Sequence, residues 1–294
     1  MHKQIVVPTL CSLLSLVLAT AVQAQSFFHA VTNLNPVGYW PLNETTAPPA
    51  SKPAAVNAGT LGAADNGTYS DGAIPGVAGA LAGDSEGGCL FCGATGVNPR
   101  MTAPYDPAYA NVTTFMIEAW VNSAVTDPAE SCPVNCLDTA SPRHGWLIFV
   151  DPTGAGQINL RTYAGSGTTA SLNYVMTVPG GHILSNTWYH VVISFNGTTA
   201  QGYINGQPQA LSANASGYLA STAGPFAIGA RSDSAFAFQG SVDEVAFYSS
   251  LLTASAVLAH YQAGTNPAPA TSYYALVTNA NTPAPPTTSS GTSW

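Results

Sequence analysis

Four cysteines beyond the N-terminal leader form two close pairs, suited either to disulfides or to a metal. Cys89 and Cys92 belong to the segment CLFC, and Cys132 and Cys136 belong to CPVNC. Cysteines of exported proteins usually pair as disulfides, whereas four thiolates at such spacings also suit a structural zinc site. We favour disulfides, because oxidation competes with metal binding outside the cytosol. The pairs 89–92 and 132–136 are the simplest connectivity, and a cross-link between the two segments is the alternative.

A second group of side chains has the chemistry of a sugar-binding site. Aromatic rings stack on sugar rings, and planar polar side chains hydrogen-bond to sugar hydroxyls. Trp146 and Tyr163 lie on expected mid-chain strands, and Arg161 alternates onto the same face as Tyr163. We predict that these three residues bind ligand. The alternative is that the four tryptophans of the expected strands all fill the core, namely Trp40, Trp120, Trp146 and Trp188.

The histidines do not indicate a catalytic centre. They are scattered at positions 29, 144, 182, 190 and 260, without the spacing of metal ligands. No phosphate-binding glycine loop is present, and the G-x-S-x-G pattern at 83–87 lies in a Gly-rich segment rather than between an expected strand and an expected helix. His190 lies on an expected strand, where a packed or surface histidine is more common than a base. We therefore assign no catalytic residue.

These side chains must be positioned by β-strands. Short apolar runs separated by Gly, Asn, Pro and Asp turns are typical of an all-β sandwich. The clearest is 188–195, where Tyr189, Val191, Ile193 and Phe195 share one face by period-two alternation. We expect the other strands of the middle and late chain at 115–121, 145–150, 157–163, 201–205, 226–230 and 242–248.

One short helix is expected near the C-terminus. Thr253 is suited to cap a helix over 254–262, and Gly264 to end it. Residues 265–294 then form a linker and tail rich in Pro, Thr and Ser. Within this tail, 272–281 (SYYALVTNAN) echoes 26–35 (SFFHAVTNLN) without a gap. We interpret the echo as the truncated start of a second copy of the module, with chance similarity as the alternative.

The first 24 residues have the layout of a secretory signal peptide. A short positive start precedes an interrupted apolar run and the small residues at 22–24, so cleavage is predicted after Ala24. No later stretch supplies the ~20 apolar residues of a membrane span. The mature chain keeps five basic and fourteen acidic residues, since Lys3 is removed. This balance excludes nucleic acid as a partner and disfavours anionic lipid. We predict a secreted or cell-surface protein.

Four segments resemble laminin-G-like jelly-roll domains of the concanavalin A-like superfamily. They lie at 36–44 (PVGYWPLNE), 115–121 (FMIEAWV), 188–207 (WYHVVISFNGTTAQGYINGQ) and 226–264, the last containing FAIGARSDS and GSVDEVAFY. Their order and spacing are similar to those of the family. The resemblance implies an all-β, two-sheet antiparallel jelly-roll sandwich over 26–264, and many members bind glycans or proteins.

The resemblance also implies a possible calcium ion. Hard cations need several oxygen ligands, usually carboxylates and backbone carbonyls. Asp243 lies where related jelly rolls often carry an acidic residue, and Glu44 is a companion from the first strand. Asp233 lies in a segment similar to the calcium loop of pentraxins, although Arg231 stands where that loop carries a glutamate. For each carboxylate, a structural role is the alternative.

Some relatives are glycoside hydrolases, whose retaining members need two carboxylates ~5–5.5 Å apart. Those relatives place the pair two or four residues apart on one strand. Here Glu118 stands alone on its expected strand, Asp84 and Glu86 lie in a Gly-rich segment, and Asp243 and Glu244 are adjacent. We therefore predict a non-catalytic binding module for carbohydrate, glycoconjugate or an extracellular protein. A structural protein that self-associates head to tail is the alternative, and a glycoside hydrolase is the third hypothesis.

Overall fold

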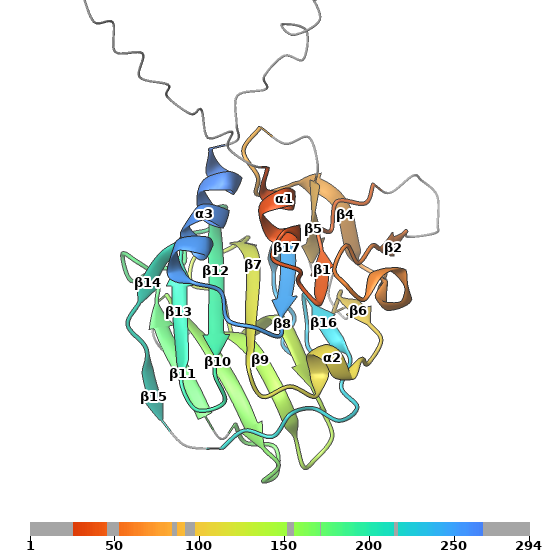
Figure 1. Ribbon diagram of the computed structural model, residues 1–294, viewed down its shortest axis with the longest axis vertical. Coiled ribbons are helices and arrows are strands. Elements are labelled where there is room, and N and C mark those ends of the chain that lie inside the picture. The colour runs from red at the N-terminus through yellow and green to blue at the C-terminus, as the bar shows by residue number, and fades with distance from the viewer. Residues whose placement is uncertain are drawn as a thin grey trace, which may run out of the picture.

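The computed structural model describes residues 26–45, 53–83, 87–91, 98–151, 156–170, 172–214 and 217–266. Within them, the strands form two antiparallel sheets packed face to face (Figure 1). The predicted leader and the echo at 272–281 lie outside these residues. The predicted all-β, two-layered sandwich is confirmed.

The first sheet has eight strands and carries two of the helices on its outer face. In the order β14-β13-β12-β7-β17-β5-β4, with β1 beside β17, its strands are Gln207–Gln209, Ala200–Ile204, Trp188–Phe195, Phe115–Ser123, Gly240–Tyr248, Gly87–Phe91, Ala73–Ala78 and Gly38–Trp40.

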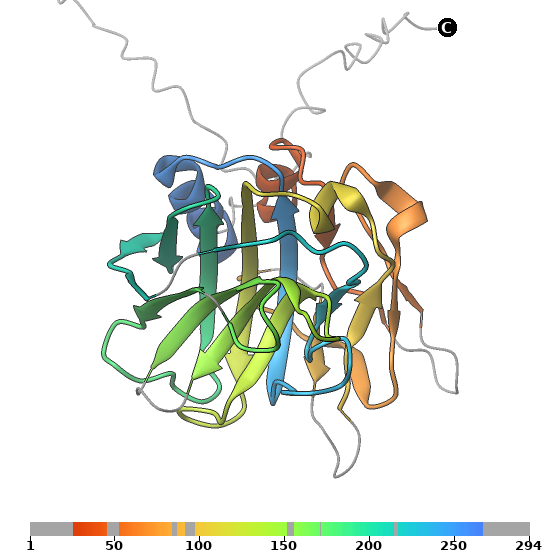
Figure 2. The same ribbon diagram turned by 90° about the horizontal axis from the view of Figure 1, so that it is seen from below.

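The second sheet has nine strands and lies across the first in Figure 2. In the order β15-β11-β10-β9-β8-β16-β6-β3-β2, its strands are Ser212–Asn214, Leu172–Thr177, Gln157–Ala164, His144–Asp151, Ser131–Leu137, Phe226–Ile228, Met101–Ala103, Gly67–Tyr69 and Ala54–Ala55.

The strands expected from the sequence are present with small changes at their ends. β12 runs from Trp188 to Phe195, and its residues of odd number all lie in the core between the sheets, as the alternation predicts. Its even face is also covered, because Val192 packs with the helix layer. The segment CPVNC, which is not among the strands expected from the sequence, forms part of strand β8 inside the second sheet.

Aromatic side chains fill the space between the sheets. Trp146 of β9 is fully buried and stacks on Phe115 and Phe247, at centroid distances of 5.4 and 5.9 Å. Trp40 and Phe226 extend the same cluster, with centroids 4.6 Å apart. This dense aromatic packing fixes how the two sheets sit on each other. It therefore also fixes which side chains face outward from each sheet.

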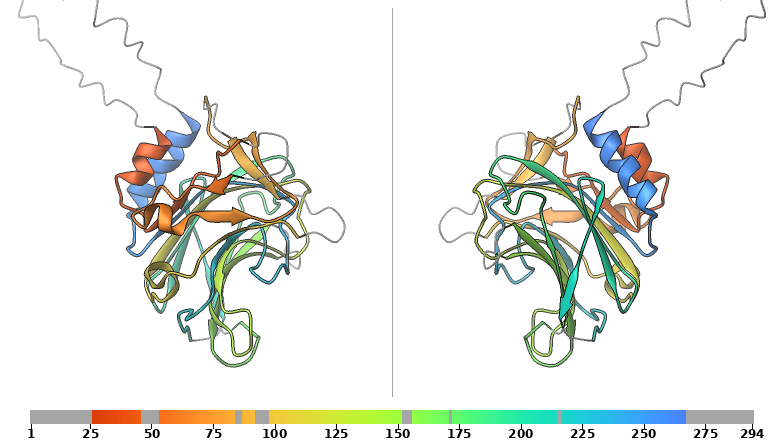
Figure 3. Two further views of the ribbon diagram at one scale, coloured as in Figure 1. Left: turned by 90° about the vertical axis from the view of Figure 1, so that its right-hand side faces the viewer. Right: turned by 90° about the vertical axis from the view of Figure 1, so that its left-hand side faces the viewer.

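Two helices cover the outer face of the first sheet side by side (Figure 3). α3 (Ala254–Thr265) begins at the predicted cap, where the hydroxyl of Thr253 accepts from the N–H of Ala256. α1 (Phe27–Thr32) was not expected, because six residues carry too weak a helical pattern. Its apolar side chains Phe27 and Val31 are buried against the sheet, so packing stabilises it. The remaining helical turns are η1 (Gly62–Asp65) and α2 (Pro107–Ala110).

Candidate functional site

The outer face of the second sheet is built by alternation along β9 and β10. On β9, Trp146 and Ile148 point into the core, whereas Leu147 and Phe149 point outward. Arg161 of β10 pairs with Leu147 in the antiparallel register, and it also faces outward. Because side chains alternate between the two faces of a strand, the inner face of β9 and β10 is apolar. The outer face carries both apolar and cationic side chains.

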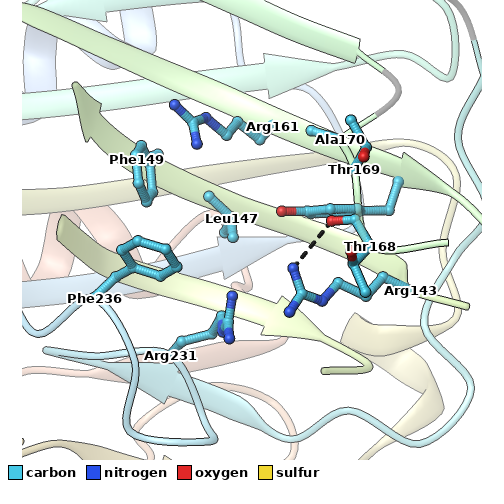
Figure 4. Close-up of a pocket in the computed structure, with 10 residues that line it drawn as sticks. Arg143, Leu147, Phe149, Arg161, Thr168, Thr169, Ala170, Arg231 and Phe236 are labelled. Atoms are coloured by element: carbon cyan, nitrogen blue, oxygen red, sulfur yellow. Dashed lines mark hydrogen bonds between the residues drawn. The ribbon is translucent and has the colours of Figure 1, made fainter. Parts of the chain in front are cut away.

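A hollow of about 360 Å³ lies on this outer face (Figure 4). The two strands form its floor, and the segments at 165–170 and 231–236 stand beside it. Its volume lies in the ~300–1,000 Å³ range of ligand pockets. We call it the arginine pocket and define it by its lining residues, which are Arg143, Leu147, Phe149, Arg161, Tyr163, Thr168, Thr169, Ala170, Arg231 and Phe236.

Two of its three arginines are held by a carboxylate and an aromatic ring. Arg161 donates to Asp151 at 2.8 Å, and its guanidinium lies 3.6 Å from the ring centroid of Phe149. Arg231 donates through two nitrogens to Asp233, at 2.8 and 2.6 Å. Such bidentate pairs and cation–π contacts orient a guanidinium firmly. Neither carboxylate belongs to the pocket lining.

Arg143 is held differently. Its Nε donates to the carbonyl of Thr139 at 3.1 Å, and its Nη1 donates to the carbonyl of Thr168 at 3.0 Å. Its guanidinium lies 5.9 Å from the ring centroid of Tyr163. Among the described residues, Arg143 forms no ion pair, and its charge acts on Asp233 only at longer range. Figure 4 shows Arg143 and Arg231 on one side of Leu147 and Arg161 on the other.

Tyr163 contributes the phenol hydroxyl of the pocket. The residue is 5% exposed, and within the described part of the chain its hydroxyl makes no hydrogen bond. Burial raises the pKa of this hydroxyl above its ordinary value, although the positive charges of all three arginines act against that rise. The hydroxyl therefore stays protonated at neutral pH, where it is available as a donor.

The structure brings together two of the three residues predicted to bind sugar. Arg161 and Tyr163 line the arginine pocket, whereas Trp146 lies in the core, as the alternative predicted for this tryptophan. Trp188 does not follow that alternative, because it is only partly buried and packs against the helix-side cluster. The sequence did not indicate Arg143 or Phe236 as members of this site. They reach it from segments outside the regular strands, where alternation carries no signal.

The three predicted calcium ligands are each occupied by protein donors. Glu44 accepts from the N–H of Val56 and the hydroxyl of Tyr69, both at 2.6 Å. Asp243 accepts from the N–H of Ala80 at 2.8 Å, and Asp233 is paired with Arg231. The described residues contain no group of three or more His, Cys, Asp or Glu side chains arranged to hold a metal. The carboxylates thus do not fit a calcium site, and calcium binding stays an untested prediction.

The predicted disulfide between Cys132 and Cys136 is wrong. Both thiols are free and buried, and burial raises the pKa of each. A β-bulge between Ser131 and Val134 shifts the alternation of β8. As a result, Cys136 points into the core while Cys132 joins the outer cluster under the arginine pocket. Cys89 is buried in β5, and Cys92 lies outside the described residues, so a link between these two stays a prediction.

A buried polar cluster lies on the opposite side of the molecule, beneath α1 and α3. Glu118 of β7 accepts hydrogen bonds from His190 at 2.7 Å, from Tyr248 at 3.0 Å and from His260 of α3 at 3.0 Å. The other ring nitrogen of His260 faces the carbonyl of Ala30 in α1 at 3.1 Å. Both nitrogens of His260 therefore face acceptors, an arrangement that requires both to carry protons.

The charges of this cluster stabilise each other. Burial alone would raise the pKa of Glu118, but the positive His260 and the hydrogen bonds from both histidines hold it well below its usual range. Burial would lower the pKa of His260, and Glu118 outweighs that effect and raises it. Glu118 is 1% exposed and His260 is 2% exposed. A substrate does not reach this pair. Its hydrogen bonds instead hold both helices against the sheet.

The fold agrees with a family match over residues 96–258, more than half of the 294 residues. The matching model describes the concanavalin A-like lectin/glucanases superfamily. The chain belongs to this superfamily. Its pair of antiparallel sheets is the one that the sequence resemblance implied.

Solved structures with the same fold include a sialidase and two toxin domains. A Trypanosoma rangeli sialidase mutant displaying trans-sialidase activity aligns with a TM-score of 0.51 at 17% identity, over 79% of this chain and 33% of its own. The binding domain of botulinum neurotoxin serotype D gives 0.52 and 12%, over 79% and 52%. That of Paraclostridial mosquitocidal protein 1 gives 0.53 and 15%, over 78% and 52%.

At these identities the likeness shows the fold alone. The chain spans about a third of the sialidase and about half of each toxin domain. The sequence finds no match among curated proteins. Within the described residues, no helix combines the length and apolar character needed to cross a bilayer.

Proposed function

We propose that this protein is a non-catalytic module that binds carbohydrate in the arginine pocket. The main observation behind this proposal is that one hollow on the open face of a lectin-like sheet combines aromatic rings, threonine hydroxyls and guanidinium groups. Rings provide apolar faces for a sugar, and the polar groups hydrogen-bond to its hydroxyls. Phe236 is 38% exposed, so it offers ring surface to a ligand. Two of the structural neighbours are binding domains by name, which is compatible with this role.

The composition of the pocket supports binding rather than hydrolysis. None of its ten lining residues is acidic, whereas glycoside hydrolysis normally uses two carboxylates that flank the scissile bond. Asp151 and Asp233, which form ion pairs with lining residues, are each held by an arginine. Buried Glu118 and Glu244 lie in the other sheet. A release of reducing sugar from laminarin- or agar-type polymers would contradict the non-catalytic assignment.

The experiment compares glycan binding by the unmodified protein with two tyrosine variants. Tyr163→Phe removes the pocket hydroxyl and keeps the buried ring, so the fold is retained. We expect it to weaken binding of the best glycan about three- to tenfold, the loss typical of one hydrogen bond. Tyr105→Phe removes a hydroxyl from a tyrosine that is 37% exposed and outside the pocket, and it should bind normally. If neither a glycan array nor soluble oligosaccharides bind the unmodified protein, the proposal is wrong.

A second candidate function is head-to-tail assembly through α1 and its sequence echo. In α1, the hydroxyl of Ser26 caps the helix, Phe27 and Val31 are buried, and Asn33 is the C-cap. The echo has Ser, Tyr, Val and Asn at the four matching positions, within residues 272–281. The echo thus repeats the residue types by which α1 is capped and packed. We propose that it can dock on a neighbouring molecule in place of α1, which would link copies in an open chain.

A further inference from the structure

The arginine pocket concentrates positive charge in an acidic protein. The chain has fourteen acidic and six basic residues, and four of the basic residues are arginines. Three of these four, Arg143, Arg161 and Arg231, line one hollow. The fourth, Arg100, donates to the hydroxyl of Ser234 outside it. The strands and loops that carry the three are far apart in sequence, so their convergence is a property of the fold.

The positive charge is partly uncompensated. Asp151 and Asp233 each neutralise one arginine from behind the lining. The charge of Arg143 has no such partner among the described residues, since its two hydrogen bonds go to backbone carbonyls. The pocket therefore keeps about one net positive charge, and it faces solvent on a protein whose remaining field repels anions.

The donors of the pocket are also oriented in advance. Each guanidinium lies over an aromatic ring, at 3.6 Å for Arg161, 5.1 Å for Arg231 and 5.9 Å for Arg143. Beside them, Tyr163 lines the pocket, and its hydroxyl has no hydrogen-bond partner in the described chain. A guanidinium fork matches the paired oxygens of a carboxylate or sulfate, and little entropy is lost when the fork is already held.

We propose that the arginine pocket selects glycans that carry an anionic group, either a carboxylate or a sulfate ester, and that Arg143 and the Tyr163 hydroxyl contact this group. The inference rests on the proposed glycan-binding function and names the class of its ligand. Neutral sugars offer hydroxyl oxygens as acceptors, but they carry no anionic group to balance the charge of Arg143. Binding should weaken as salt is raised, because the attraction is between charges.

The experiment measures affinity for three glycans of equal length, which are neutral, carboxylated and sulfated. The full chain should bind at least one charged probe about tenfold or more above the neutral one. Arg143→Gln should remove most of this preference, and Arg143→Lys should restore part of it, because it keeps the charge without the fork. Arg100→Gln changes the net charge equally at the arginine outside the pocket, so it should keep the preference. Melting temperatures identify any variant that fails to fold.

The outcomes separate this inference from the function on which it rests. Equal affinity for neutral and charged glycans, or an unchanged preference in Arg143→Gln, would overturn the anion selectivity while glycan binding stands. Binding of inorganic sulfate as tight as that of a sulfated glycan would support an anion site and overturn the glycan function. Binding of no glycan and no sulfate would overturn both. The proposal is supported if Arg143→Gln loses the preference for charged glycans while Arg100→Gln keeps it.

Discussion

The pair of Glu118 and His260 makes stability depend on pH in two opposite ways. Glu118 has a folded pKa below its unfolded value of about 4.3, so its contribution is present above that pH and is lost as pH falls through the folded pKa. His260 has a folded pKa above its unfolded value of about 6.5, so its contribution is present below that pH and is lost as pH rises through the folded pKa. Both contributions are complete between about pH 4.3 and 6.5.

Glu118→Gln should remove this dependence and destabilise the protein. The variant leaves His260 buried without a counter-charge, which costs on the order of 3 kcal/mol in the free energy of unfolding. Urea unfolding at several pH values measures the effect. The unmodified protein should be most stable near pH 5 to 6, within the window set by the two pKa shifts, and the variant should show a flatter profile. Glu130→Gln, at an exposed glutamate, is the matched control. An unchanged profile in Glu118→Gln would contradict the assigned role.

Strand β8 shows how one bulge changes the chemistry of a segment. A regular strand places residues four apart on the same face, so Cys132 and Cys136 would point the same way. The bulge between Ser131 and Val134 inserts a residue, and the two thiols then face opposite sides of the sheet. Their separation is imposed by pairing with β9 and β16, which holds the backbone in place.

The free state of these thiols predicts their reactivity. Because both are buried and burial raises their pKa, alkylation of the native protein should leave Cys132 and Cys136 unmodified. In urea without a reducing agent, both should react fully, as peptide mass spectrometry would show. Detection of a 132–136 disulfide peptide in the unreduced protein would contradict the structure. The peptide with Cys89 and Cys92, examined in the same digest, tests the other predicted pair.

The whole molecule has one face built for packing and one open to a ligand. The outer side of the first sheet is closed by α1 and α3 over an apolar cluster and the Glu118 pair (Figure 3). The outer side of the second sheet keeps the arginine pocket open. The aromatic core separates the two faces, so the ligand binding and the docking at α1 that we propose would use different faces of the molecule.

Removal of residues 267–294 tests whether whole molecules assemble head to tail. The truncated chain keeps α1, α3 and both sheets, so it should have an unchanged melting temperature. If the echo docks on neighbouring copies, the full chain should form larger species as its concentration rises, whereas the truncated chain stays monomeric in light scattering. The full-length variant Val277→Asp should behave like the truncated chain. Equal assembly by all three proteins would exclude the echo as the linker.

Patterns in the sequence determined seven strands of the middle and late chain, the last helix and the family. Alternation along 188–195 and the cap at Thr253 are local features, and the structure confirms both. Such patterns are readable because each depends on neighbours within one or two turns of chain. The same alternation placed Arg161 and Tyr163 on one face, which identified part of the pocket.

Tertiary structure decided which of these residues meet. Arg143 and Arg231 are 88 positions apart, and they converge because strand pairing brings their segments to one face. The core position of Trp146 follows from how the sheets stack, and the separation of the cysteines follows from the bulge in β8. α1 forms because Phe27 and Val31 find a surface to pack on. Each outcome depends on contacts between distant segments, which local pattern does not contain.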